Sequence, residues 1–224
     1  MNKRYRFTLV ELLVVIGIIA ILAGLILGAV TLSQASARKT QAKTDMASII
    51  MALRSVENTY GKMVNTGTAS FQGKDVETSK SNSDNTSNDT WVFGGENNVD
   101  AYDAFIAELS VPKNSGITAN KLNVNKRKIT FLEPRSDFDP SKTYNDTDNV
   151  SKLWRDPWGN PYRIYINILG EKYLKVGSQN VAADVAIYSF GPNGTDDGGC
   201  HADLDTCISS GTHKMHDDIV SWRK

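Results

Sequence analysis

The chain has 224 residues, a formal net charge of zero and a very uneven distribution of apolar residues. This length suits one compact domain with an appendage. Because phosphate binding needs a basic surface, the balanced charge gives no reason to expect a nucleic-acid partner. The strongest apolar sequence lies before residue 31, and the remainder is polar and rich in Asn, Asp, Ser and Thr. We therefore expect an apolar anchor followed by a globular head.

The first thirty residues combine a short basic start with a long uncharged run. Lys3, Arg4 and Arg6 precede the run Leu12–Val30, which contains no charged residue. About 20 apolar residues cross a hydrocarbon core of roughly 30 Å, so the run has spanning length. Since basic residues before a span stay in the cytoplasm, we expect the C-terminal head outside it.

Glu11 lies at the edge of this apolar run. A charged side chain in the centre of a membrane-spanning helix costs about 2.5–3.5 kcal/mol, and one at the boundary costs less. The position therefore suggests that Glu11 has a use, which a cation at the same membrane depth would supply.

The sequence FTLVEL at residues 7–12, followed by a long apolar helix, resembles the cleavage and methylation motif of type IV prepilins and type II secretion pseudopilins. The resemblance implies that a prepilin peptidase cleaves between Arg6 and Phe7 and that the new Phe7 amine is methylated. It also implies that Glu11 neutralises the Phe7 amine of a neighbouring subunit during assembly. The family usually has Gly before the cleaved bond, where this chain has Arg6, so either the peptidase is permissive or cleavage is slow or absent.

Two other interpretations of the N-terminal segment stay open. A plain signal anchor explains the apolar run but not Glu11. A cleavable secretory signal agrees with the small residues at 35–37, but the apolar run exceeds the usual signal core of about 7–15 residues. The first residue of the mature protein distinguishes the three interpretations, because it would be Phe7, Met1 or Arg38 respectively.

Helical periodicity continues beyond the apolar run. Apolar or small residues recur at alternating spacings of three and four from Leu32 to Tyr60, interrupted by Lys39, which is typical of an amphipathic helix. Gly61 then provides a helix stop. We predict one continuous helix from about Phe7 to Tyr60, whose second half packs on the head through this stripe.

The head has the pattern of an α+β domain. We predict a short helix at 101–109 and strands of an antiparallel sheet at 127–132, 162–168, 172–176 and 184–190, because these last segments are rich in β-branched and aromatic residues. Residues 65–90 almost lack aliphatic side chains and predict a long solvated loop.

The sequence DPWGNPY at residues 156–162 stands just before one of these strands. Its Pro and Gly residues predict a turn, and we expect Trp158 and Tyr162 to anchor that turn in the core. The segment resembles a turn of major pseudopilins. We interpret it as structural, without a ligand.

An acidic, glycine-containing loop is predicted at 189–219. Calcium prefers the oxygen donors found there, although the loop lacks the EF-hand pattern. It resembles the calcium loop of major pseudopilins, which implies these ligands: Phe190 through its carbonyl oxygen, Asn193, Asp217 and Asp218, with Asp196, Asp197, Asp203 or Asp205 as a replacement. Asn193 stands where the family usually has Asp, which predicts a lower affinity. A solvated acidic loop without metal is the alternative.

The only two cysteines, Cys200 and Cys207, lie in this same stretch. A disulfide between them agrees with an oxidising compartment outside the cytoplasm. Zinc is a weaker interpretation, because no pair has the tight CxxC spacing of structural zinc sites. The histidines that suggest it are His201, His213 and His216.

The resemblance thus predicts a major-pseudopilin-like subunit of a type II secretion system, which polymerises into a short periplasmic pseudopilus that drives protein export. Its partners would be its own copies, minor pseudopilins, the prepilin peptidase and the inner-membrane assembly platform. It would cross the inner membrane once, with its N-terminus in the cytoplasm. Residues 1–6 would be a leader, 7–30 the membrane and assembly half of the helix, 31–61 its amphipathic half and 62–224 the periplasmic head.

A second hypothesis is a minor or specialised type IV pilin-like surface protein, in which the anchor tethers a binding module that uses residues 65–90. An enzyme is the weakest hypothesis. The chain has no Gly-x-Ser-x-Gly, phosphate-loop or HExxH pattern, each of which carries a specific chemistry.

Overall fold

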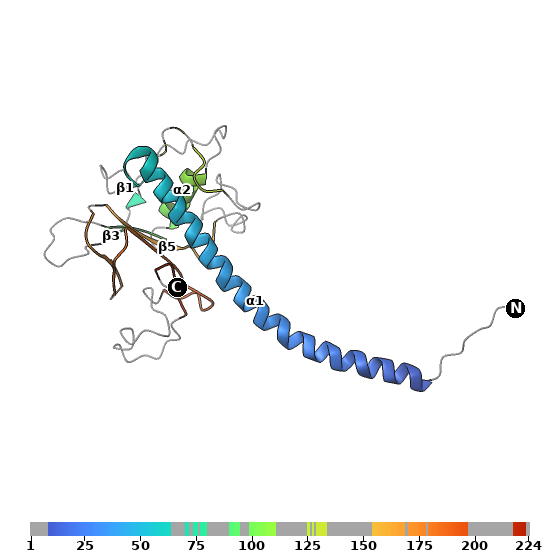
Figure 1. Ribbon diagram of the computed structural model, residues 1–224. Coiled ribbons are helices and arrows are strands. Elements are labelled where there is room, and N and C mark those ends of the chain that lie inside the picture. Colours follow the sequence, from blue (N-terminus) through green and yellow to red (C-terminus); the bar gives the residue numbers. More distant parts are fainter. Residues whose placement is uncertain are drawn as a thin grey trace. The chain divides into compact units, whose positions relative to one another are not determined.

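The long helix α1 (Leu9–Tyr60) contributes to both of the compact units into which the chain divides, Met1–Thr40 and Gln41–Lys224 (Figure 1). The computed structural model describes residues 9–63, 70–71, 74–75, 77–79, 90–94, 99–110, 125, 127, 129–133, 154–168, 170–177, 179–196 and 217–222. The side chains of residues 25–32, 70–79, 99–101 and 104 lie outside this description.

Helix α1 confirms the predicted long helix, although its expected start at Phe7 lies outside the described residues. The predicted stop is also confirmed. Gly61 has a φ of 74°, and its N–H donates to the carbonyl oxygen of Glu57 at 2.7 Å. Because glycine adopts positive φ at little cost, this residue ends the helix and satisfies one of its last carbonyl groups.

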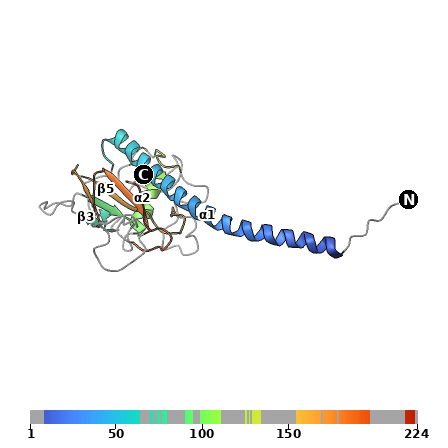
Figure 2. The same cartoon turned by 60° about the horizontal axis from the view of Figure 1, so that its bottom comes forward.

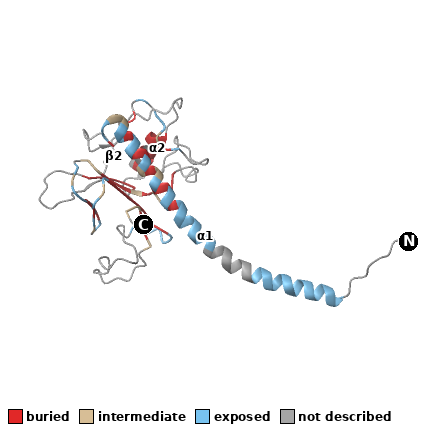
Figure 3. Cartoon of the chain, in the orientation of Figure 1, coloured by how far each residue is buried: buried red, intermediate tan, exposed pale blue. Residues whose placement is uncertain are grey.

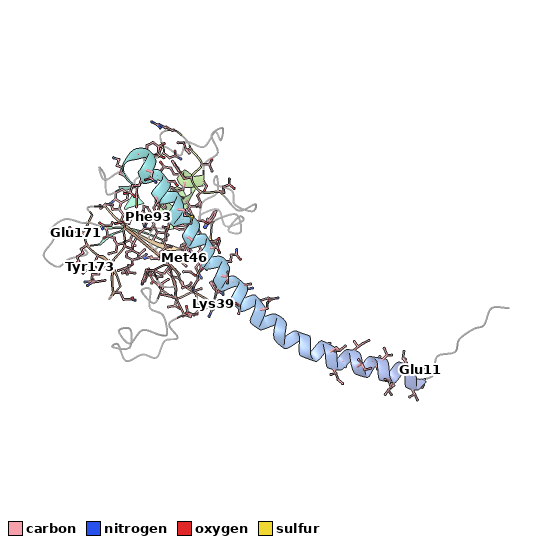
Figure 4. All side chains as sticks on the ribbon, in the orientation of Figure 1. Glu11, Lys39, Met46, Phe93, Glu171 and Tyr173 are labelled. Atoms are coloured by element: carbon pink, nitrogen blue, oxygen red, sulfur yellow. The ribbon has the colours of Figure 1, made fainter. Side chains whose placement is uncertain are left out.

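In the first unit, the residues of α1 whose side chains are described, 9–24 and 33–40, are all exposed (Figure 3). Eleven large apolar residues between Leu9 and Leu22 are 47–79% exposed. Glu11, near the start of the helix, is the one charged residue within 9–24 (Figure 4). No helix in the described part of the chain is both long enough and apolar enough to cross a membrane.

In the second unit, one stripe of α1 is buried. Its members recur at helical spacings and are Ala42, Asp45, Met46, Ile49, Ala52, Leu53 and Val56. The prediction that the stripe begins at Leu32 was wrong for the part before residue 40, since Ala35 and Lys39 are exposed. Those two residues belong to the first unit, Met1–Thr40.

The head is α+β, as predicted. A five-stranded antiparallel sheet has the order β3–β4–β5–β8–β9, and its strands are β3 (Glu77–Ser79), β4 (Thr90–Phe93), β5 (Arg163–Asn167), β8 (Val185–Ser189) and β9 (Ile219–Val220). Two antiparallel pairs join β1 (Ser70–Phe71) to β2 (Lys74–Asp75) and β6 (Leu174–Val176) to β7 (Gln179–Val181). The helix predicted at 101–109 is confirmed as α2 (Val99–Ser110).

Strands β4, β5, β8 and β9 bury side chains on both faces of the sheet, since successive side chains of a strand point to opposite sides. On one face, Phe93, Ile164 and Ile187 pack with α1 and α2 in the main core, and Figures 1 and 2 show both helices beside the sheet. On the other face a second core includes Tyr165 and Tyr188. It also contains Val92, Leu174, Val176, Val181, Ala186, Phe190 and Val220.

Two sequence predictions for the head were wrong. Residues 127–132 do not form a strand in their described part. Instead, the backbone N–H groups of Phe131 and Leu132 both donate to the carbonyl oxygen of Leu109 at 2.9 Å, which ties this segment to the end of α2. The stretch 65–90 is not simply a loop, since it contains β1, β2 and β3 and the first residue of β4.

The tyrosine of the predicted turn connects the sheet to α1. Tyr162 is fully buried, and its hydroxyl donates to Asp45 Oδ2 at 2.9 Å. Burial and the neighbouring Asp45 carboxylate raise the pKa of Tyr162, so the phenol stays protonated and remains a donor. This bond spans 117 residues of sequence and joins the middle of α1 to the start of β5.

We expect Tyr162→Phe to reduce the free energy of unfolding by about 1–3 kcal/mol, because the nearly buried Asp45 carboxylate loses a donor. Chemical denaturation of the full-length protein in detergent micelles measures the change. Tyr173→Phe is the matched control, since that side chain is 39% exposed. Equal effects of the two substitutions would contradict the hydrogen bond between Tyr162 and Asp45.

Candidate functional site

The acidic loop is the connection between β8 and β9. These antiparallel strands place Ser189 opposite Ile219. The register therefore brings the residues just after β8 next to those just before β9. Gly191 lies so close to the backbone of Asp217 that a Cβ atom at Gly191 would overlap the Asp217 carbonyl oxygen. Both ends of the loop thus meet at one place, although most of the connection between them lies outside the described residues.

Two of the predicted calcium ligands are brought together at this place. The backbone N–H of Asn193 donates to Asp217 Oδ2 at 3.1 Å. Asn193 Oδ1 accepts a hydrogen bond from the Thr195 N–H at 2.6 Å, which closes a tight turn. The next residue, Asp218, is completely buried. Asn193 and Asp217 therefore lie side by side, and the calcium-ligand roles of Asn193, Asp217 and Asp218 stay predictions.

One carboxylate oxygen at this place accepts no hydrogen bond from the described residues. Asp217 Oδ1 is buried and has no donor among them. A buried polar atom left without a partner costs about 1–3 kcal/mol, and more if it is charged. A cation would satisfy it, and carboxylate, amide and carbonyl oxygens suit calcium. An unpartnered, buried carboxylate oxygen is a feature that a calcium site would use, and the calcium site itself stays a prediction.

The remaining predicted ligands are placed differently. The Tyr188 hydroxyl donates to Asp196 Oδ1 at 2.6 Å, and Arg163 Nε lies 3.9 Å from Asp196 Oδ2. These contacts direct the Asp196 carboxylate toward β5 and β8. Phe190 is buried in the second core. Within the described ranges, no three His, Cys, Asp or Glu side chains converge in a way that holds a metal ion.

Several predicted residues lie outside the described part of the chain. They are Arg6 and Phe7 of the cleavage motif, Asp197, Asp203 and Asp205, and the cysteines Cys200 and Cys207. The calcium-ligand roles of these three aspartates, the disulfide and the cleavage site therefore stay predictions. The three histidines of the zinc hypothesis are also among these residues.

The turn at 156–160 supports the acidic loop. The sequence did not indicate this contact. Asp156 Oδ1 accepts hydrogen bonds from the N–H groups of Trp158 and Asn160 at 3.0 and 2.8 Å. Its other oxygen, Oδ2, accepts a hydrogen bond from the Ser189 hydroxyl at 2.6 Å. Burial raises the pKa of the Asp156 carboxyl, and the hydrogen bonds from Ser189 and Asn160 oppose that rise. The predicted turn is confirmed, and it also holds the end of β8.

The chain matches no family model, no curated protein and no solved structure.

The close approach of Gly191 to Asp217 gives a direct test of how the loop closes. We expect Gly191→Ala to destabilise the head by more than the roughly 1–2 kcal/mol that a left-handed backbone costs an L-residue, since the new methyl group meets backbone. Gly194→Ala is the matched control, because its φ is also positive, at 66°, and the nearest atom is a flexible Asn160 side chain at 3.4 Å. Denaturation curves compare the two variants, and equal losses would contradict this loop geometry.

Proposed function

We propose that this chain is a membrane-anchored filament subunit of the pilin type, resembling the major pseudopilin of type II secretion. The observation that carries the proposal is the apolar surface of the first half of α1, whose eleven large side chains between Leu9 and Leu22 are all exposed. Soluble monomers rarely expose contiguous apolar patches above a few hundred Å². Such a surface is stable only when lipid or other apolar helices cover it.

Lipid and other copies of the chain would cover this surface in turn. In the sequence the uncharged run extends from Leu12 to Val30, which is close to the length that spans a bilayer. Before assembly the run would anchor the chain in the inner membrane, with the head in the periplasm. After cleavage at Phe7 the same surfaces would pack against each other in the filament, with Glu11 beside the Phe7 amine of a neighbour.

The head would supply contacts between subunits, and calcium would order it. Asp217, Asp218, Asn193 and the Phe190 carbonyl group are the residues proposed to hold the ion. When bound, calcium supplies positive charge that neutralises adjacent carboxylates and joins the two ends of the β8–β9 connection. The proposal assigns no catalytic reaction to this protein. Minor pseudopilins, the prepilin peptidase and the assembly platform are the partners that it implies.

Filament formation tests the proposal. In cells that contain the cognate assembly machinery, we expect the chain in filaments that electron microscopy detects with an antibody against the head. Shearing and sedimentation should separate these filaments from membranes. A chain that stays in the membrane as a monomer, while its head binds a ligand, would contradict the proposal and favour the tethered binding module.

Calcium binding is tested on the full-length protein in detergent micelles. A ligand that binds only the folded state contributes about 2.7 kcal/mol at a hundredfold excess over its Kd, which corresponds to a rise in Tm of roughly 5–10 °C for a protein of this size. We expect Tm to be higher by this amount in calcium than in chelator, and we expect Asp217→Ala to abolish the difference. An unchanged Tm in millimolar calcium would contradict the calcium site and leave the filament proposal standing.

A further inference from the structure

A relay of hydrogen bonds leads from Asp156 into the acidic loop. The Gly191 N–H donates to Ser189 Oγ at 3.1 Å, and the Ser189 hydroxyl donates to Asp156 Oδ2 at 2.6 Å. Ser189 is completely buried and Asp156 is 4% exposed. Hydrogen bonds to an ionised acceptor are roughly twice as strong as neutral ones. The relay therefore fixes Gly191, the second residue after β8, from within the protein interior.

The Asn160 side chain of the same turn lies close to Gly194. The Cβ position at Gly194 lies 3.4 Å from Asn160 Nδ2, and the Asn160 N–H is itself bonded to Asp156. Asn193 lies between Gly191 and Gly194, and its N–H reaches Asp217 Oδ2. The turn that Asp156 organises therefore holds the loop on the Gly191 side of Asn193, through Ser189.

We infer that Asp156 is a positioning residue for the cation site: it acts through Ser189 to hold the loop at the spacing that brings Asn193 to Asp217. Both oxygens of Asp156 already accept hydrogen bonds from the turn and from Ser189, so Asp156 acts on the cation through the loop and not as a ligand. The inference rests on the calcium site proposed above and adds a residue that is distant from it in sequence.

Calcium titration of the full-length protein in detergent micelles tests this role. Ser189→Ala removes the relay and leaves the hydrogen bonds of Asp156 to its own turn. Residues that orient metal ligands typically change metal affinity about 10–100-fold when they are replaced. We expect a loss in this range for Ser189→Ala and for Asp156→Asn, with no further loss in the double variant. Val56→Ala, a buried substitution in α1, is the control, and it should lower Tm without changing calcium affinity.

Amide hydrogen exchange in chelator gives a readout that does not depend on bound calcium. We expect the Gly191 and Asn193 amides to exchange faster in Ser189→Ala than in the unaltered protein, and to be unaffected by Val56→Ala, since loop amides exchange through local opening. Unaltered protein that binds calcium, together with variants of unchanged affinity, would overturn the inference alone. Unaltered protein that does not bind calcium would overturn both the calcium site and the inference.

Discussion

Replacing Glu11 by glutamine is expected to abolish most filament assembly. Glu11 is the one charged residue within 9–24, and its neighbours on α1 are apolar. A carboxylate packed among apolar helices is costly unless a cation lies beside it. The Phe7 amine of the next subunit would provide that cation. If this pair favours each contact by about 2 kcal/mol, its loss weakens subunit association roughly 30-fold.

Glu57→Gln is the matched control, because it makes the same chemical change in the second unit. Sheared filaments are quantified by immunoblot in cells that contain the assembly machinery, and the membrane-bound chain is measured in parallel. We expect Glu11→Gln to accumulate in the membrane while Glu57→Gln assembles normally. Normal amounts of filament from Glu11→Gln would contradict the proposed role of the carboxylate.

Breaking the buried ion pair between α2 and the segment before β5 is expected to have the largest effect on stability. Arg155 donates to both oxygens of Asp103, at 2.6 and 3.0 Å, and the two side chains are only 5% and 3% exposed. The guanidinium also donates to the Trp154 carbonyl oxygen and lies 5.3 Å from the centre of the Tyr102 ring. These contacts give hydrogen-bond acceptors to most of the N–H groups of the buried Arg155 guanidinium.

We expect Arg155→Met to reduce the free energy of unfolding by about 3–5 kcal/mol, because it leaves the Asp103 carboxylate buried without its cation. Tm should fall by roughly 10 °C. The double variant Arg155→Met, Asp103→Leu should be more stable than Arg155→Met, since it removes the stranded charge. Denaturation of the four proteins forms a double-mutant cycle, and a coupling energy near zero would contradict the buried pair.

The sequence predicted those parts of the fold whose signals are local. The three- and four-residue spacing identified α1, and Gly61 identified its end. Richness in β-branched and aromatic residues identified β5 and β8. Each of these patterns depends on the geometry of one element, so neighbouring residues in the chain contain the required information.

The missed elements depend on contacts between distant segments. Strand β3 is polar and pairs with β4, whose other neighbour is β5, more than seventy residues later. The polar composition of β3 gives no local strand signal, and the pairing of β4 with β5 joins segments too far apart in sequence to leave one. Conversely, residues 127–132 have the composition of a strand, but their backbone is bonded to the end of α2. Tertiary contacts there override β-propensity.

Only part of the candidate site was predicted, because its remaining contacts also join segments distant in sequence. Resemblance placed Asn193 and Asp217 together, and the register of β8 and β9 explains why they meet. The supporting contacts of Asp156 and Asp196 were missed, because a carboxylate in a loop has the same sequence signal whether it binds a metal or a neighbouring hydroxyl. Only the fold shows that Ser189 and Tyr188 are their partners.

The most direct test of the central claim is the mass of the mature N-terminal peptide, measured on the protein purified from its own cells. Processing and methylation by a prepilin peptidase are what distinguish a pilin-type subunit from any other membrane-anchored protein. We expect a peptide that begins at Phe7 and carries one methyl group on its amine. A peptide that begins at Met1 or at Arg38 would contradict the filament-subunit account and indicate a plain signal anchor or a cleaved secretory signal instead.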